Sequence, residues 1–284
     1  KTRSGKTTAP RISDIFPFFR IFTQAKKCVD TSAFAGIIER MAIRRRRLGK
    51  TNVEVSILGL GGEGVLRTPG HDKAAAELIN TALDLGINYM ETARAYGPSE
   101  SYYGGALAER RKDIFLAGKA HAREKSSALE SLAETLKNLK TDYLDLWQVH
   151  DVRTEDDMNK IFGPGGAIEA FREAKQKGIV RFIGVTGHHS PSIIRRCLEA
   201  FDFDTVLIPV NPAETCARSF LEEVMPVAGP KDVGVIAMKV FLRGLFNAPK
   251  KLLLSYALSQ PVSAAVVGCD NIEQLKENAE AAAA

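Results

Sequence analysis

The sequence predicts an α/β protein built as a single-domain (β/α)8 TIM barrel, a closed ring of eight parallel strands enclosed by helices. From Leu48 onward, eight short apolar runs are each followed by a segment with helical periodicity. The runs are nearly continuous rather than alternating, which indicates parallel strands buried on both faces. A succession of eight strand–helix units is most simply closed into a barrel.

The eight units follow one another along the chain. We predict strands at residues 55–60, 87–91, 114–117, 143–149, 180–185, 205–210, 233–238 and 262–267. We predict helices at residues 73–85, 100–110, 126–139, 167–177, 191–200, 219–228, 250–259 and 272–283. Gly86, Gly178 and Gly234 each precede a strand, where we expect left-handed helix caps. Ser190 before Pro191 predicts the start of the fifth helix.

A doubly wound open sheet would show a similar alternation and is the alternative fold. It would carry a G-x-G-x-x-G turn that opens a helix directly after the first strand. Residues 59–64 have the order Gly, Leu, Gly, Gly, Glu, Gly, which lacks this pattern. The barrel is therefore the preferred prediction.

The chain has 284 residues, of which 45% are hydrophobic, and carries a formal net charge of +5. Residues 1–50 contain 13 of the 39 Lys and Arg but only three of the 34 acids, so the remainder carries 26 minus 31, or −5. A mildly acidic body does not favour nucleic-acid binding. No apolar run approaches the roughly 18 residues that a membrane span needs. The four cysteines are far apart, so we expect a cytoplasmic protein without a disulfide framework or metal.

Residues 1–43 form a basic segment with a cluster of Ile and Phe. Because the chain starts at Lys1 and Met41 stands just before four consecutive arginines, we expect a disordered or non-native extension ahead of a barrel at residues 44–284. An organellar targeting or membrane-surface helix within residues 1–40 is the alternative. We interpret the arginines as a solvated strand edge.

Polar residues stand at the ends of three consecutive predicted strands. Glu91 ends the second strand and Tyr96 lies in the loop after it, while Lys119 follows the third strand and His150 the fourth. In a barrel the carboxyl ends of the strands form one rim, which carries the active site. Each residue alone is compatible with a packing or ion-pair role. Together on one rim, they indicate acid–base chemistry.

Electrostatics suggests how these groups act on one another. A phenol titrates near pH ~10, and a buried ammonium beside it would lower that value. A carboxylate paired with Lys119 would keep the lysine charged. His150 would orient a carbonyl oxygen next to Tyr96.

Several motifs occur in a fixed order between about Arg47 and Ala282. Residues 91–97 match D-T-A-x-x-Y-G except for Glu91 in the first position. Lys119 ends a strand of its own, and an L-x-x-x-H strand ends in His150. Residues 184–186 are similar to a G-V-S-N strand, and residues 268–278 to a terminal G-x5-Q-L-x-x-N segment. In these motifs the sequence resembles the aldo-keto reductase superfamily.

The resemblance implies a (β/α)8 barrel and NADPH-dependent reduction of an aldehyde or ketone, or the reverse oxidation, without a metal. It implies that Tyr96 is the proton donor, that Lys119 and Glu91 tune it, and that His150 orients the carbonyl. It implies cofactor contacts at Gly61, Gly62, Thr186, Gly187, Lys239, Phe241, Arg243, Gly268, Asp270, Gln274 and Asn278. The expected partner is a small-molecule carbonyl substrate, and the sequence is silent on oligomeric state.

The chain also departs from the pattern of the family. Glu91 is one methylene longer than the usual Asp, and we expect Glu91→Asp to retain or raise activity. Thr186 and Gly187 replace the Ser-Asn pair that holds the carboxamide in the family. The usual Gln and Tyr of strand six fall on Leu207 and Val210.

These departures leave alternatives open. Asp270 would repel a 2′-phosphate, so NADH is the alternative to NADPH. His188 and His189 would compensate by contacting phosphate or substrate, or they face solvent. A catalytically weak, nucleotide-binding regulatory barrel is the second functional hypothesis, and an isomerase or lyase on the same barrel is the third.

Overall fold

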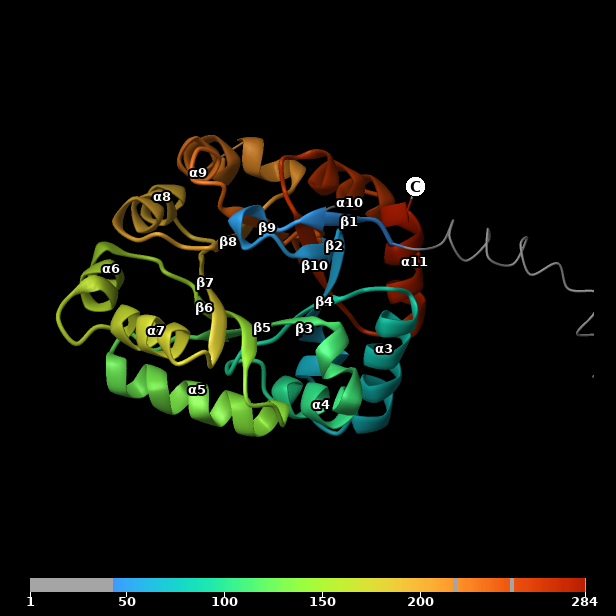
Figure 1. The fold of residues 1–284 in the computed structure, drawn as a ribbon. Helices are drawn as coiled ribbons and strands as arrows, with labels where there is room; N and C mark the ends of the chain where they lie inside the picture. The colour runs from blue at the N-terminus through green and yellow to red at the C-terminus, as the bar shows by residue number, and fades with distance from the viewer. Residues whose placement is uncertain (1–42, 217–218, 246–247, 284) are drawn as a thin grey trace, which may run out of the picture. The chain divides into compact units, whose positions relative to one another are not determined.

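The structure, a computed structural model, describes residues 43–216, 219–245 and 248–283, and in these residues eight parallel strands form a closed barrel (Figure 1). The order around the ring is β10, β3, β4, β5, β6, β7, β8, β9. The barrel strands are β3 (Leu58–Gly64), β4 (Tyr89–Glu91), β5 (Phe115–Ala120), β6 (Leu144–Val149), β7 (Val180–Thr186), β8 (Thr205–Pro209), β9 (Gly234–Met238) and β10 (Ala264–Cys269). The predicted (β/α)8 architecture is confirmed.

Helices surround the ring on the outside (Figure 1). They are α3 (Asp72–Asp84), α4 (Ser99–Ala106), α5 (Lys125–Leu139), α6 (Glu155–Phe162), α7 (Ala167–Gln176), α8 (Pro191–Ala200), α9 (Phe220–Ala228), α10 (Lys250–Ser259) and α11 (Ile272–Ala283). Most of them bury apolar side chains toward the ring, whereas α6 contacts chiefly α7 and α8. Between β6 and α7, for example, the Trp147 and Phe171 rings stack with centroids 3.7 Å apart. Helix α6 was not predicted, and it begins with a capping box between Thr154 and Asp157.

The first predicted strand was wrong as a single element. Residues 55–60 are divided between β2 (Glu54–Ser56), which pairs antiparallel with β1 (Arg45–Arg47), and β3, which enters the barrel. The arginine run does form a strand, as predicted. The Arg46 guanidinium, however, is not simply solvated, because it donates to the carbonyls of Val262 and Leu258 at 2.9 and 3.0 Å. This hairpin is thereby fixed to the end of α10 and to the segment just before β10.

The barrel interior changes from apolar to polar along its axis. Leu48 and Val55 of the hairpin segment pack against the inward residues at the amino ends of the strands and are fully buried. Above them the Phe115 ring stacks between Tyr89, at 5.7 Å, and Phe182, at 6.1 Å. Further toward the carboxyl ends, the inward positions are ionic or polar. The hairpin segment therefore closes one end of the interior, and the polar side chains gather at the other.

Glycines mark two kinds of constraint at the helix–strand junctions. Gly86 and Gly178 have φ values of 83° and 71°, so the predicted left-handed caps are confirmed. Gly234 does not adopt this conformation. A side chain at Gly234 would place its Cβ 2.7 Å from Leu48 Cδ1, so the glycine makes room for the hairpin segment. The predicted cap at Ser190 is confirmed, because its side chain accepts from Ile193 N–H at 3.4 Å.

The predicted second helix ends early. Helix α4 stops at Ala106, and the chain continues as a 3-10 segment (Ala108–Asp113) after Ala108 takes a φ of 38°. The left-handed backbone at Ala108 interrupts the α-helical hydrogen-bond pattern.

The predicted extension, residues 1–43, lies outside the described residues except for Ile43. This residue is buried in the larger of the two hydrophobic clusters. Within the part of the chain that the structure describes, no helix is long and apolar enough to cross a membrane.

Candidate active site

The structure brings the four predicted catalytic side chains together at the carboxyl rim. Glu91 is the last residue of β4, Lys119 lies near the end of β5, and His150 follows β6 directly. The Lys119 ammonium lies 5.0 Å from the centroid of the Tyr96 ring. The Tyr96 and His150 rings are 5.8 Å apart and nearly perpendicular, at 86°. Tyr96 is thus bordered by a cation on one side and an imidazole on the other.

Glu91 is the centre of a buried polar cluster. Its Oε1 accepts a hydrogen bond from Lys119, and its Oε2 accepts from the Tyr89 hydroxyl at 3.2 Å and from Gln148 Nε2 at 3.1 Å. Glu91 and Lys119 are 4% and 1% exposed, so this ion pair is shielded from water. Hydrogen bonds from Tyr89 and Gln148 satisfy the second oxygen of Glu91, which offsets part of the cost of burying the pair.

The longer side chain of Glu91 has a structural explanation. It reaches Tyr89 and Gln148 as well as Lys119. A shorter aspartate would withdraw from these donors, and a buried donor without an acceptor costs about 1–3 kcal/mol. We therefore expect Glu91→Asp to lower stability, and the expectation that it retains or raises activity stays a prediction.

Burial dominates the acid–base properties of the cluster. It raises the pKa of the Tyr96 phenol; Lys119 acts in the opposite direction, and Glu91 adds to the rise. Our expectation that Lys119 lowers this pKa holds for its own contribution, but burial outweighs it. Burial works to lower the pKa of Lys119, yet Glu91 prevails and raises it, which keeps the ammonium charged. Burial, together with Lys119, His121 and other nearby cationic groups, lowers the pKa of His150, so its imidazole is neutral.

Sequence reasoning missed the roles of Tyr89 and Gln148. Both signals were present, because residues two apart on a strand face the same side. Tyr89 stands two residues before Glu91, and Gln148 two residues before His150. Gln148 is also paired in register with Lys119.

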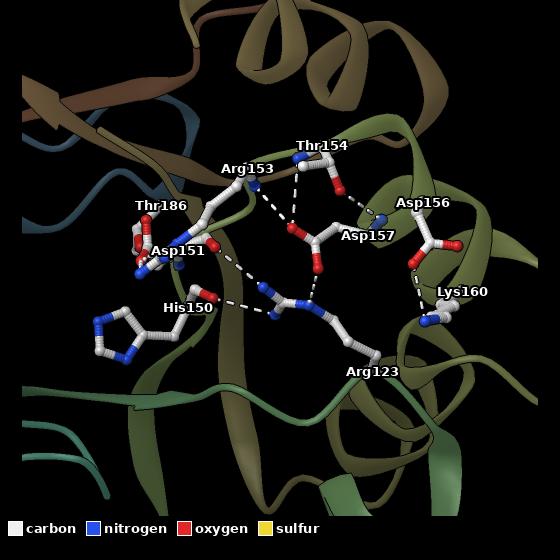
Figure 2. A network of polar contacts seen from close by, with 9 residues as sticks. All are labelled: Arg123, His150, Asp151, Arg153, Thr154, Asp156, Asp157, Lys160 and Thr186. Carbon is white, nitrogen blue, oxygen red and sulfur yellow. Dashed lines mark hydrogen bonds and ion pairs between the residues drawn. The ribbon is translucent and has the colours of Figure 1, made fainter. Parts of the chain in front are cut away.

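The turn after β6 is fixed by a second polar network (Figure 2). The Arg123 guanidinium donates to the carbonyl oxygens of His150, at 3.0 Å, and Asp151, at 2.9 Å. Its Nε donates to Asp157 Oδ1 at 2.9 Å. The Asp151 N–H donates to Thr186 Oγ1 at 2.8 Å, which connects β6 to β7. These bonds hold Asp151 in a left-handed conformation, with φ 54°, and orient His150.

Several predicted cofactor residues lie at the end of β10 and in α11. Some of them are exposed and others are packed in the interior. Asp270 is exposed, and its N–H donates to Gln274 Oε1 at 3.0 Å. Gly268 is partly exposed at the end of β10. Asn278, in contrast, is buried, and its amide donates to Cys269 Sγ at 3.5 Å. In this arrangement the Asn278 amide is tied to the last residue of β10, and its contact with a cofactor stays a prediction.

Gly61 and Gly62 are both buried in β3. A Cβ at Gly62 would lie 2.4 Å from Ser99 Oγ, so Gly62 is needed to pack β3 against α4. A Cβ at Gly61 would make only ordinary contacts, at 3.4 Å.

The remaining predicted cofactor residues lie after β7 and β9. Thr186 is buried, with its hydroxyl facing the turn at Asp151. A Cβ at Gly187 would lie 2.4 Å from Ile194 Cδ1 and 2.8 Å from the Val152 carbonyl, so this site leaves no room for an amide side chain. Lys239 has a φ of 57°, and the partly buried Phe241 follows it. Arg243 lies in the 3-10 turn Leu242–Gly244, and its side chain is outside the described part.

Comparison with known proteins identifies the family of the chain. Residues 57–251, more than half of the chain, match the model of the aldo/keto reductase family. The chain belongs to this family. An uncharacterized oxidoreductase, YqkF, of Bacillus subtilis (strain 168) is 29% identical over 84% of this chain and 91% of the relative. L-galactose dehydrogenase of Arabidopsis thaliana is 26% identical over 84% of this chain and 88% of that enzyme.

Solved structures agree with this aldo-keto reductase assignment. The holo form of aldo-keto reductase AKR11C1 from Bacillus halodurans superposes with a TM-score of 0.74 at 27% identity, covering 85% of this chain and 91% of that one. An aldo-keto reductase from Klebsiella pneumoniae in complex with NADPH has a TM-score of 0.72 and 20% identity, covering 85% and 90%, and its likeness shows the fold alone. As a member of the aldo-keto reductase family, the protein is an NAD(P)H-dependent oxidoreductase.

Proposed function

We propose that the protein reduces an aldehyde or ketone to an alcohol, or runs the reverse oxidation, with Tyr96 as the general acid. The observation that carries this proposal is the position of the phenol between the Lys119 ammonium, 5.0 Å from the ring centroid, and the His150 imidazole, 5.8 Å away. The raised pKa of Tyr96 keeps the proton on the phenol at neutral pH, which is the form a proton donor needs.

Each neighbour has a separate task in this proposal. Tyr96 gives its proton to the carbonyl oxygen as that oxygen gains negative charge. Lys119, held in its charged form by Glu91, stabilises the phenolate that remains. His150 is neutral and carries a proton on one ring nitrogen, so it can donate a hydrogen bond to the same oxygen without adding a charge.

The rim has the donors and acceptors that a polar cofactor and substrate require. His150 Nδ1 and Gln148 Oε1 are buried and have no hydrogen-bond partner among the described residues. Such atoms are costly unless a ligand or water pairs with them. A bound nicotinamide would supply the hydride. Thr186 would border the nicotinamide, while the backbone at Gly268, Asp270 and Gln274 would hold the adenosine end.

An exposed carboxylate at the proposed adenosine end leads us to favour NADH, which reverses the order that the resemblance implies. Asp270 is exposed, and its carboxylate lies within 3.4 Å of the Gln274 amide. A carboxylate accepts hydrogen bonds from a ribose 2′-hydroxyl but repels a 2′-phosphate. We therefore assign NADH as the preferred cofactor and NADPH as the competing one.

Single-turnover measurements test the assigned acid. Nicotinamide fluorescence decay is followed after mixing the enzyme and NADH or NADPH with a panel of aldehydes, for the intact protein, Tyr96→Phe and Tyr143→Phe. Tyr143 precedes β6 at the opposite end of the barrel, where the Arg111 guanidinium lies over its ring, so it is the matched control. Tyr96→Phe should lower the rate by about 10²–10⁴-fold and Tyr143→Phe should leave it unchanged. Equal rates for the intact protein and Tyr96→Phe would contradict the proposal.

One observation favours a second candidate, a nucleotide-binding barrel with slow turnover. Gly187 is packed against Ile194, so the side chain that holds the carboxamide elsewhere in the family has no counterpart there. A loosely held nicotinamide reacts slowly, because rate depends steeply on the orientation of the reacting atoms. Tight binding of NADH with negligible turnover of every aldehyde would favour this second candidate.

A further inference from the structure

Beside the proposed carbonyl site, three side chains converge at the carboxyl ends of β6 and β7. Asp151 Oδ1 lies 3.2 Å from His188 Nε2 and 3.7 Å from His189 Nε2. The two imidazole rings are 4.3 Å apart, tilted by 37°. One ligand atom from each residue lies within 4.8 Å of both others. We propose that Asp151, His188 and His189 form a binding site for a divalent transition-metal ion such as Zn²⁺ or Co²⁺.

The separations fit one shared ion. Zinc binds imidazole nitrogen and carboxylate oxygen at about 2.0–2.2 Å, so two ligand atoms of a tetrahedral ion lie about 3.4 Å apart. The distances from Asp151 to the two imidazoles lie on either side of that value. The two imidazole nitrogens lie within 4.8 Å of each other, so an ion would draw the two rings together.

The carboxylate is oriented before any ion arrives. Its Oδ2 is engaged by Arg153, whose Nε and a terminal nitrogen donate at 2.8 and 2.5 Å. Its Oδ1 is buried, faces the two imidazoles and accepts no hydrogen bond among the described residues. The backbone of Asp151 is fixed by Thr186 Oγ1 and by Arg123 (Figure 2). Groups outside the ligand set commonly orient metal ligands in this way.

The ligand types select the class of ion. Two imidazoles and one carboxylate suit zinc and other first-row transition metals, whereas Mg²⁺ and Ca²⁺ prefer ligand sets made only of oxygen. Three protein ligands leave a fourth position, and the histidine side chains are 27% and 45% exposed, so water or a small ligand can enter. Arg153 and Lys239 lie near the site and oppose a cation. We therefore expect weaker binding than at a structural zinc site.

The competing explanation for the same geometry is an ion pair between Asp151 and a protonated histidine. In that case the positive charge facing Asp151 Oδ1 would belong to an imidazolium and not to a metal ion. The proposal rests on the three side chains alone and does not depend on the reaction assigned to Tyr96. Metal binding can therefore be measured without any turnover.

The experiment uses the full, untagged chain after treatment with a chelator. Co²⁺ is added, and the visible absorption of the bound ion is recorded, followed by displacement with Zn²⁺ and a parallel attempt with Mg²⁺. His188→Ala and Asp151→Asn remove ligands, and His71→Ala is the matched control because His71 is exposed at the start of α3. We expect one equivalent of Co²⁺ in the intact protein and in His71→Ala, displaced by Zn²⁺ and not by Mg²⁺. Each ligand variant should bind at least about 10-fold more weakly.

Two results would overturn the metal site. One is the absence of new absorption in the folded intact protein at millimolar Co²⁺, which would leave the histidine–carboxylate ion pair. The other is unchanged binding in both ligand variants. Circular dichroism checks that each variant is folded, and if Asp151→Asn is not, His189→Ala, which alters the more exposed imidazole, replaces it in the comparison.

Discussion

Lys119 and Gln148 lie in register on neighbouring strands, and both side chains end on the same carboxylate, that of Glu91. The register places an ammonium and an amide side by side in the barrel interior. Their shared acceptor explains why a glutamate can stand where the family has an aspartate. The acid is long enough to serve both strands and Tyr89 as well.

Shortening that acid should therefore be harmful. In Glu91→Asp we expect the free energy of unfolding to fall by about 1–3 kcal/mol, because Tyr89 and Gln148 lose their acceptor. Urea unfolding of the variant and of Glu91→Gln, which keeps the length but not the charge, measures the change. An aspartate variant as stable as the intact protein and at least as active would restore the expectation from the family pattern.

Removing Lys119 alone should lower the free energy of unfolding more than removing Lys119 and Glu91 together. Lys119→Met leaves Glu91 charged and buried, which we expect to cost about 3–5 kcal/mol. The double variant Lys119→Met with Glu91→Leu removes both charges and should recover part of this loss. Denaturant unfolding of the two variants and the intact protein completes the comparison. If the single variant is as stable as the intact protein, the Glu91–Lys119 pair is not shielded from water as described above.

Two adjacent glycines in α4 should respond oppositely to the same substitution. A Cβ at Gly104 would lie 2.1 Å from the Asn138 carbonyl oxygen of α5, whereas a Cβ at Gly105 meets nothing within 4 Å. We expect Gly104→Ala to destabilise the protein by about 1–3 kcal/mol. Gly105→Ala should be neutral or stabilise it by up to about 1 kcal/mol. Thermal unfolding distinguishes them, and equal midpoints would mean that α4 and α5 are not so closely packed.

Asp157 should make stability depend on acid pH. Burial acts to raise the pKa of its carboxyl, but hydrogen bonds from the Arg123 side chain and the N–H groups of Arg153 and Thr154 outweigh burial and lower it. A depressed pKa in the folded state gives stability that is present above the unfolded value, about 3.9, and is lost as the pH falls through the folded value. We expect Asp157→Asn to cost about 1 kcal/mol at pH 7 and progressively less in acid. A difference that does not change between neutral and acid pH would show that the carboxylate charge is unimportant.

Cofactor choice should respond to a single acid. Asp270 is exposed and lies next to the Gln274 amide, away from the buried Glu91 pair. Asp270→Ser removes the charge that repels a 2′-phosphate, so we expect the affinity for NADPH to rise about 10-fold relative to NADH. Nicotinamide fluorescence titration with both cofactors measures this ratio, and Glu273→Ser is the nearby acidic control. An unchanged ratio in Asp270→Ser would show that Asp270 does not determine the choice of cofactor.

The barrel could be predicted because its strands and helix ends are defined by short stretches of sequence. Apolar runs define strands, and Ser190 and the glycines Gly86 and Gly178 define the junctions. The errors have separate causes, and one of them is a contact between residues far apart in the sequence. The split near Ile57 depends on pairing of β2 with β1, and Gly234 is needed for the approach of Leu48. Helix α6 is only eight residues long and was overlooked despite its capping box.

The candidate site was predictable in its members but not in its connections. The ends of three successive strands placed Glu91, Lys119 and His150 on one rim. The sequence could not show that Asn278 is buried against Cys269, or that Gly187 is closed off by Ile194. Those facts depend on how helices pack on the outside of the ring.

The closure of the barrel by Leu48 and Val55 has a consequence for proton supply. A phenol that gives up a proton in each cycle must recover one before the next. Because the far end of the interior is apolar and sealed, that proton arrives from the rim. His121 is exposed there and stacks on His150 with ring centroids 3.9 Å apart. If Tyr96 is the proton donor, as we propose, its proton is restored at this rim, where Tyr96 is itself partly exposed and His121 and His150 lie close by.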